Sequence, residues 1–311
     1  MAYDNIIKIG TRGSMLALIQ AEIVKNAFED SFPDYEFEIV PMRTEGDRNL
    51  STPLSEFGGK GVFVTEIEDA LTSHRIDFAV HSMKDMPMDL GEGLDILAVV
   101  PREDARDVLV TLKNDAFFFA EANEFTKKYF EKYSDRKIII GTGSGRRIFQ
   151  LNKLYSERGN IVFRNIRGNV QTRLSHIGKD VDAVVLAMAG LIRLGLSELS
   201  GYYYRTFNFK EIVPAGGQGT IAIEGIDDEF HRSMAAKIND EKSFRESEIE
   251  RYILRRLDAG CTTAIGVKAT IFNDNLCLNI NFDEHTPSFM NALGKESDWK
   301  NLADEMINNY L

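Results

Sequence analysis

The sequence predicts an α/β protein with two similar lobes, each built around a mostly parallel sheet, followed by a small α+β unit. Short β-branched runs alternate with helical patterns from residue 6 onward, which is typical of βαβ units. The alternation restarts after a proline- and charge-rich stretch at 101–107, which suits a crossing between domains. A chain of 311 residues also exceeds the usual size of one hydrophobic core.

The first lobe is expected to contain five regular elements and a sixth before the crossing. We expect strand 6–10, helix 15–28, strand 35–42, helix 62–74, strand 76–82 and strand 94–100. The polar and irregular stretch 44–57 fits an active-site lid and an ordinary surface loop about equally well.

The second lobe repeats the pattern. We expect a strand within 137–143, helix 146–155, strand 161–166, helix 169–177 and a strand within 183–190. The aromatic and charged segment 114–136 has roughly helical spacing and is interpreted as helical packing without chemistry. A glycine-rich hinge at 213–220 leads into an apolar run that could return the chain to the first lobe.

The sequence pattern of the last part of the chain predicts the small α+β unit. Residues 243–259 form an amphipathic helix with Ser243 as a plausible N-cap, and strands at 264–270 and 277–282 and a helix over 297–311 follow. Three domains are therefore expected, and their ranges are 1–103 with 219–238, then 104–218, then 239–311.

The charge balance limits the possible partners. The formal net charge of −11 opposes non-specific binding to nucleic acid or to anionic membranes. No apolar run reaches the ~18 residues of a membrane span, and the N-terminus does not resemble an export signal, so we expect a cytoplasmic protein. Arginine is nevertheless concentrated at 146, 147, 164, 167 and 173, which indicates a local anion site.

Two glycine-rich motifs have features of phosphate-binding loops. GTGSGRR at 141–147 follows a strand and opens a helix, so it can bind an anion, but Arg146 and Ile148 stand where a dinucleotide fingerprint needs glycine. GGKG at 58–61 is not a P-loop, because Gly61 replaces the required Ser or Thr. The histidines show no metal-ligand spacing, so no metal is expected.

Two further motifs place reactive groups at the ends of elements. HSMKDMP at 81–87 puts an imidazole, an ammonium and a carboxylate at the end of a strand, where a solvated turn is the ordinary interpretation. Cys261 lies in DAGCTTAIG, on a loop with small neighbours, whereas Cys277 between two leucines fits a buried small hydrophobic residue. A disulfide between them is not expected in the cytoplasm.

Eight segments, taken together and in order, resemble the hydroxymethylbilane synthase family, also called porphobilinogen deaminase. They are RGSMLALIQA (12–21), GGKGVFVTEIE (58–68), AVHSMKDMP (79–87), GTGSGRR (141–147), RGNVQTRL (167–174), AGLIRLGL (189–196), PAGGQG (214–219) and AGCTTAIG (259–266). The resemblance implies lobes like those of periplasmic binding proteins and a monomer. It also implies an enzyme that builds a linear tetrapyrrole from four porphobilinogen molecules, with loss of ammonia, on a dipyrromethane primer held by a cysteine thioether.

The resemblance also assigns roles to residues. Cys261 would carry the dipyrromethane, and Asp85 would stabilise the azafulvenium-type cation that forms when ammonia leaves. The cofactor would be held by Lys84, Asp85, Ser144, Arg146 and Arg147. Porphobilinogen and the growing chain would be bound by Arg12, Ser14, Gln20, Lys60, Phe63, Arg167, Arg173 and Arg193. Two roles remain open for His81, which would either anchor the turn or transfer a proton.

The chain departs from the family pattern in the anion loop, where Gly143 and Gly145 replace a serine and a leucine. A non-catalytic protein that binds a carboxylate-bearing ligand between two lobes remains the rival interpretation, with a nucleotide-dependent enzyme third. Cys261 and Asp85 discriminate between these functions, because a binding protein needs neither a covalent pyrrole nor a carboxylate facing a cation.

Overall fold

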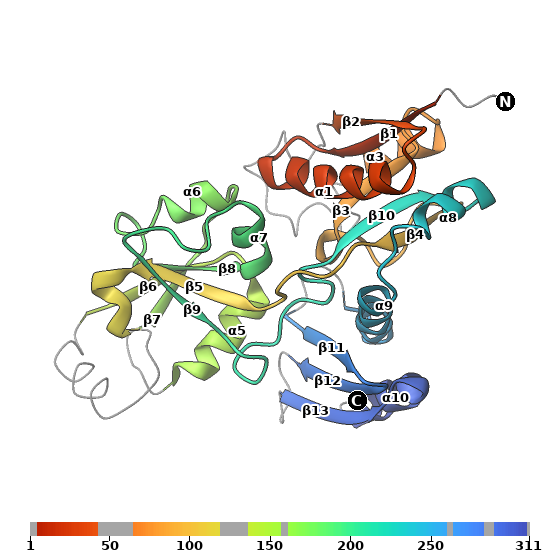
Figure 1. The fold of residues 1–311 in the computed structure, drawn as a ribbon. Coiled ribbons are helices and arrows are strands. Elements are labelled where there is room, and N and C mark those ends of the chain that lie inside the picture. The colour runs from red at the N-terminus through yellow and green to blue at the C-terminus, as the bar shows by residue number, and fades with distance from the viewer. Residues whose placement is uncertain are drawn as a thin grey trace.

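The computed structural model describes residues 5–42, 65–118, 136–156, 161–259, 264–282 and 289–309. Within these ranges the chain forms two five-stranded sheets and one three-stranded sheet, each with helices packed against it (Figure 1). Lys60, Phe63 and Cys261 lie outside the described residues, as do the stretch 44–57 and most of the segment 114–136.

The first lobe is the sheet with strand order β2-β1-β3-β10-β4. Its elements are β1 (Ile6–Arg12), α1 (Met15–Ser31), β2 (Glu36–Met42), α3 (Thr65–Thr72), β3 (Phe78–Ser82), β4 (Leu94–Val99), β10 (Ile221–Ile226) and α8 (Glu229–Ala235). β1 pairs in parallel with β2 and β3, while β10 runs antiparallel to β3 and β4. The chain therefore returns to the first lobe through β10, as predicted. Helices α1 and α8 cover one face and α3 covers the other.

The second lobe is the sheet with strand order β7-β6-β8-β5-β9. Its elements are β5 (Asp107–Leu112), η3 (Lys113–Phe118), β6 (Ile138–Gly141), α5 (Gly145–Leu154), β7 (Ile161–Arg164), α6 (Val170–Leu174), β8 (Ala183–Ala187), α7 (Met188–Arg193) and β9 (Tyr202–Thr206). In this sheet only β5 runs antiparallel to its neighbours. The predicted α/β class with mostly parallel sheets is therefore confirmed for the described residues of both lobes. Helix α5 packs on one face, and α6 and α7 pack on the other.

The C-terminal unit is a small antiparallel sheet with two main helices, which confirms the predicted α+β character of this part of the chain. It comprises α9 (Glu241–Arg256), β11 (Gly266–Phe272), β12 (Asn275–Asn281), β13 (Phe289–Lys295), η5 (Glu296–Asp298) and α10 (Trp299–Asn308). The predicted cap of α9 is wrong. Asp240 is the N-cap, and its carboxylate accepts the Ser243 backbone N–H at 2.8 Å, while the Ser243 hydroxyl accepts the Arg102 backbone N–H at 2.9 Å.

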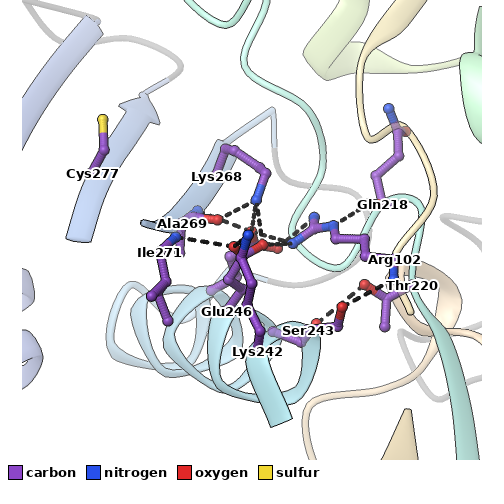
Figure 2. A network of polar contacts seen from close by, with 12 residues as sticks. Arg102, Gln218, Thr220, Lys242, Ser243, Glu246, Lys268, Ala269, Ile271 and Cys277 are labelled. Carbon is purple, nitrogen blue, oxygen red and sulfur yellow. Dashed lines mark hydrogen bonds and ion pairs between the residues drawn. The ribbon is translucent and has the colours of Figure 1, made fainter. Parts of the chain in front are cut away.

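A buried polar network joins the two crossings between the lobes to α9 (Figure 2). Arg102, in the first crossing, donates from Nε to the Gln218 carbonyl of the second crossing at 2.9 Å. The same guanidinium donates to both carboxylate oxygens of Glu250 at 2.7 and 3.0 Å. Lys268 of β11 donates to Glu246 at 2.9 Å. The glycine-rich stretch 213–220, predicted to be a hinge, is therefore a largely buried junction between three parts of the molecule.

Candidate active site

The carboxyl ends of β1 and β3 bring four of the predicted residues together. Because these strands are parallel, both end at the same edge of the sheet. Arg12 ends β1, and Ser14 caps α1 by accepting the Ala17 backbone N–H at 3.3 Å. β3 is followed by a single helical turn, η2 (Met83–Asp85). A pocket of about 100 Å³ is lined by Arg12, Ser14, Gln20 and Asp85, together with neighbouring residues of α1 and β3.

Lys84 and Asp85 face charged groups of the second lobe. Burial lowers the pKa of Lys84; Asp85 and Asp107 oppose the shift, and Arg147 and Arg146 add to it. Burial also lowers the pKa of Arg173, with a further contribution from Arg147 and opposition from Asp85. Charged side chains from the turn after β3, from α5 and from α6 therefore act on one another electrostatically, so the predicted groups of the two lobes lie near one another.

The two arginines of the anion loop are buried against one carboxylate. Ser144 caps α5 and accepts the Arg147 backbone N–H at 3.4 Å. Arg146 donates through Nη1 to Asp107 Oδ2 and to the Val213 carbonyl, both at 2.7 Å. Arg147 donates from Nε and Nη2 to Asp107 Oδ1 at 3.1 and 2.8 Å, and from Nη1 to the Val185 carbonyl at 2.9 Å.

Asp107 and Gln218 are members of the site that the sequence reasoning missed. Burial alone would raise the pKa of Asp107, but the charges of Arg146 and Arg147 outweigh it and hold the pKa well below its usual range. Gln218 donates from Nε2 to Asp107 at 2.9 Å, and its Oε1 lies 3.5 Å from Lys84 Nζ. The available signal was a charged residue directly before the apolar run 108–110, in a stretch interpreted only as a linker.

The other predicted residues are distributed around this centre. Arg193 is half-buried and donates to the Gly219 carbonyl at 2.7 Å; burial lowers its pKa to about 10 against the opposing effect of Glu103. Arg173 donates to the Gly168 carbonyl at 2.8 Å. Arg167 is exposed on the loop between β7 and α6. The amide of Gln20 is bonded to the Ser82 hydroxyl at 2.9 Å.

The charge at the meeting of the lobes suits a ligand with several carboxylates. Lys84, Arg146, Arg147 and Arg173 are cations in this group, and Asp85 and Asp107 are its anions. Two positive charges are left over among these described residues. Guanidinium groups bind carboxylates well where water is excluded, so an acetate- and propionate-bearing pyrrole fits the site.

Cys277 lies away from this centre. It is half-buried on β12, where amide groups of Asn279 and Asn291 contact its sulfur at 3.6 and 3.3 Å. Its side chain stands apart from the polar network (Figure 2). The described residues contain no cluster of three His, Cys, Asp or Glu side chains able to hold a metal, and none of their helices has the length and apolar character to cross a membrane.

Comparison with known proteins identifies the family of this chain. Residues 7–232 match the family model for the porphobilinogen deaminase dipyrromethane cofactor binding domain. The porphobilinogen deaminase of Syntrophobacter fumaroxidans is 42% identical over 89% of this chain and 84% of its own length. That of Alkaliphilus metalliredigens is 42% identical over 84% of this chain and 77% of its own length.

Solved structures give weaker likenesses. The effector binding domain of BenM with benzoate has 13% identity and a TM-score of 0.38, covering 82% of this chain and 94% of its own. An ancestral cationic amino acid solute binding protein has 12% identity and a TM-score of 0.42, covering 80% and 94%. Likenesses at this level add nothing to the description of the fold. By the family model and the two close relatives, the chain belongs to the porphobilinogen deaminase family, whose enzyme is hydroxymethylbilane synthase.

Proposed function

We propose that this chain joins four porphobilinogen molecules head to tail into hydroxymethylbilane and releases ammonia at each condensation. The observation that carries the proposal is the surplus of positive charge, on the buried Arg146 and Arg147 and the half-buried Lys84 and Arg173, beside the exposed carboxylate Asp85. The cations suit the carboxylates of substrate and product, and the carboxylate suits a cationic reaction centre.

The dipyrromethane would be attached to Cys261, with Lys84, Asp85, Ser144, Arg146 and Arg147 around it. When bound, this group supplies the nucleophilic pyrrole carbon from which the chain grows. Cys261 is a suitable attachment residue because a thiolate is a soft nucleophile for a pyrrolylmethyl carbon. In the sequence it precedes β11, whose neighbour α9 joins the crossings through Glu250.

The adjacent residues Arg146 and Arg147 would have different roles in binding. All three side-chain nitrogens of Arg147 donate to Asp107 or to a backbone carbonyl. Among the described contacts, Arg146 donates only through Nη1, and its Nε and Nη2 would serve a ligand. We therefore assign direct carboxylate binding to Arg146, and to Arg147 mainly a positive charge held in place.

The remaining predicted residues would bind porphobilinogen and the growing chain. They are Arg12, Ser14, Gln20, Lys60, Phe63, Arg167, Arg173 and Arg193. We also propose that the three sheets correspond to domains 1–103 with 219–238, 104–218 and 239–311, and that the enzyme is a cytoplasmic monomer.

Asp85 would act at the reacting carbon. Its carboxylate would accept a hydrogen bond from a pyrrole N–H and face the positive charge that develops on the substrate as ammonia leaves. A preorganised group aimed at developing charge contributes more in the transition state than in the ground state. The position of Asp85 at a strand end supported on both sides by β1 and β10 is suited to this role.

Asp85→Asn tests the function, because asparagine keeps the size of the side chain and removes its charge. We expect porphobilinogen consumption to fall by at least about 10²–10³, as for other preorganised electrostatic groups, with the thermal unfolding midpoint unchanged. The matched control is Asp89→Asn, an exposed residue four positions on, which should keep full activity. Turnover by Asp85→Asn within a few-fold of the unmodified enzyme would show that the motif is only a solvated turn.

The attachment residue is tested separately by intact-protein mass. Cys261→Ala should lack the added mass of the dipyrromethane, whereas Cys277→Ala should keep it. The aldehyde reagent that colours pyrroles provides a second measurement on the same samples. An adduct that survives Cys261→Ala and is lost in Cys277→Ala would reverse the assignment.

A further inference from the structure

A buried histidine–glutamate pair lies directly behind the turn that carries Lys84 and Asp85. His81 Nε2 is 3.0 Å from Glu224 Oε2, and the two side chains are 6% and 0% exposed. In the antiparallel register of β3 and β10, Ala222 lies opposite His81, so Glu224 is its diagonal neighbour on the same sheet face. The proposed reaction uses neither residue.

Among the residues that the structure describes, His81 is the one group that forms an ion pair with Glu224. Neither of its carboxylate oxygens accepts a well-directed hydrogen bond from a described group, and the contact with His81 is close but poorly aligned for one. Attraction between charges therefore accounts for the contact better than a directional bond. An ionised carboxylate in a dry interior is very costly unless a cation accompanies it.

The third titratable group beside the pair adds negative charge. Glu68 of α3 accepts the Gly91 backbone N–H at 3.1 Å. Burial raises the pKa of Glu68, and the nearby Glu224 charge raises it further, while His81 lowers it. With two carboxyl groups on this face, a cationic His81 is the arrangement that balances the charge.

The pair also completes the attachment of the catalytic turn. Ser82 exchanges hydrogen bonds with Gln20 of α1 at 2.9 and 3.1 Å. The Met83 backbone N–H donates to the Thr220 carbonyl at 3.0 Å. His81 supplies the third attachment, to β10. Because Asp85 is exposed, its position depends on the backbone that these contacts hold.

We propose that Glu224 maintains His81 as an imidazolium, and that this buried ion pair is a positioning element that orients the turn bearing Lys84 and Asp85. The role in turnover rests on the proposed function of Asp85, but the charge state of His81 does not. Loss of the pair should thus lower kcat more than it raises KM, because porphobilinogen carboxylates are bound elsewhere.

The first experiment measures the charge state of His81 by side-chain nitrogen NMR of the full-length ¹⁵N-labelled enzyme at neutral pH. The His81 signals are assigned by their absence in His81→Gln. We expect imidazolium shifts in the unmodified enzyme and neutral imidazole shifts in Glu224→Gln. A neutral His81 in the unmodified enzyme would overturn the proposal, whatever the outcome of Asp85→Asn.

The second experiment measures coupling through Glu224→Gln, His81→Gln and the double variant. Glu224→Gln should lose about tenfold in kcat with KM within about twofold, and intact mass should show the primer still loaded. His81→Gln should lose most, because it leaves a buried charge alone, and Glu224→Gln added to it should restore part of the activity and the thermal midpoint. Additive losses in the double variant would overturn the pairing. If His81→Gln does not fold, the single Glu224→Gln and the NMR measurement still decide.

Discussion

Asp107 is a single carboxylate that serves two buried guanidinium groups and an amide. Arg146, Arg147 and Gln218 all donate to it, and it is fully buried. Two adjacent arginines would otherwise repel each other in a medium of low dielectric constant. The sequence could not reveal this partner, because 39 and 40 residues separate Asp107 from the arginines and only the fold brings them together.

Asp107→Asn should leave two buried cations without a counter-charge. We expect a loss of about 3–5 kcal/mol in the free energy of unfolding, the range for breaking a buried ion pair, and a loss of primer loading by intact mass. Asp104→Asn is the matched control, since Asp104 pairs with the more exposed Arg106 and should cost less than about 1 kcal/mol. Equal urea midpoints for the two variants would contradict this reading of Asp107.

The contribution of Asp107 to the free energy of unfolding depends on pH, and the direction of its pKa shift determines how. The folded pKa of Asp107 lies below its unfolded value, so its stabilisation is fully present above the unfolded pKa of about 3.9. It is lost as the pH falls through the folded pKa. The stability difference between the unmodified enzyme and Asp107→Asn should therefore be constant from neutral pH down to about 4 and shrink below that value.

At the scale of elements, helix α9 covers the open edge of the small sheet. The backbone N–H groups of Ala269 and Ile271 donate to the carboxylates of Glu250 and Glu246 at 2.9 and 3.0 Å. Val267 donates to the Pro214 carbonyl at 2.9 Å. Edge strands left uncovered can pair with other chains, so α9 both satisfies β11 and attaches the unit to the crossings.

Glu250→Gln should therefore weaken more than a single ion pair. Its carboxylate accepts from Arg102, from the Gly217 backbone and from Ala269, and Arg102 and Lys268 help to hold its pKa low despite burial. We expect a loss of about 3–5 kcal/mol in urea unfolding. Glu248→Gln is the control on the exposed face of the same helix and should cost under about 1 kcal/mol. A similar loss for both variants would show that the buried network is not what anchors α9.

Burial accounts for only part of the difference between the elements that the sequence predicted and those that it missed. β5 is buried almost throughout and was still missed, because it directly follows the stretch interpreted as a crossing. β1, β3 and β8 are apolar runs inside sheets, and their hydrophobic pattern predicts strands. β9 and β13 are edge strands whose side chains are mostly half-buried or exposed, so they give little hydrophobic signal. The start of α9 was misplaced because Asp240 and Ser243 are both good caps, and only the fold shows which carboxylate or hydroxyl faces the first turn.

At the scale of the whole molecule, the two crossings pack against each other and form a largely buried junction. The sequence predicted the lobes and the return of the chain, because alternation and glycine content are local features. It could not predict that Gly217 packs on Met83 of the turn that bears Lys84 and Asp85, or that Gly219 packs on Glu103 of the other crossing. Both contacts join segments more than 100 positions apart, and they place the turn with Asp85 against the route to the second lobe.

Gly219→Ala measures how rigid this junction is. Gly219 has a φ of +89°, and a Cβ there would lie 2.4 Å from the Glu103 carbonyl oxygen, so a methyl group must push the crossings apart. Gly195 has a φ of +67° with open space around it, so Gly195→Ala adds only the backbone strain, about 1–2 kcal/mol. We expect Gly219→Ala to unfold at a clearly lower urea concentration than Gly195→Ala. It should also lose turnover of porphobilinogen, because Arg193 donates to the displaced Gly219 carbonyl and Gln218 connects Lys84 with Asp107. If the two variants were equally stable and equally active, the crossings would yield to the added methyl group, and the lobes would be joined by a flexible hinge after all.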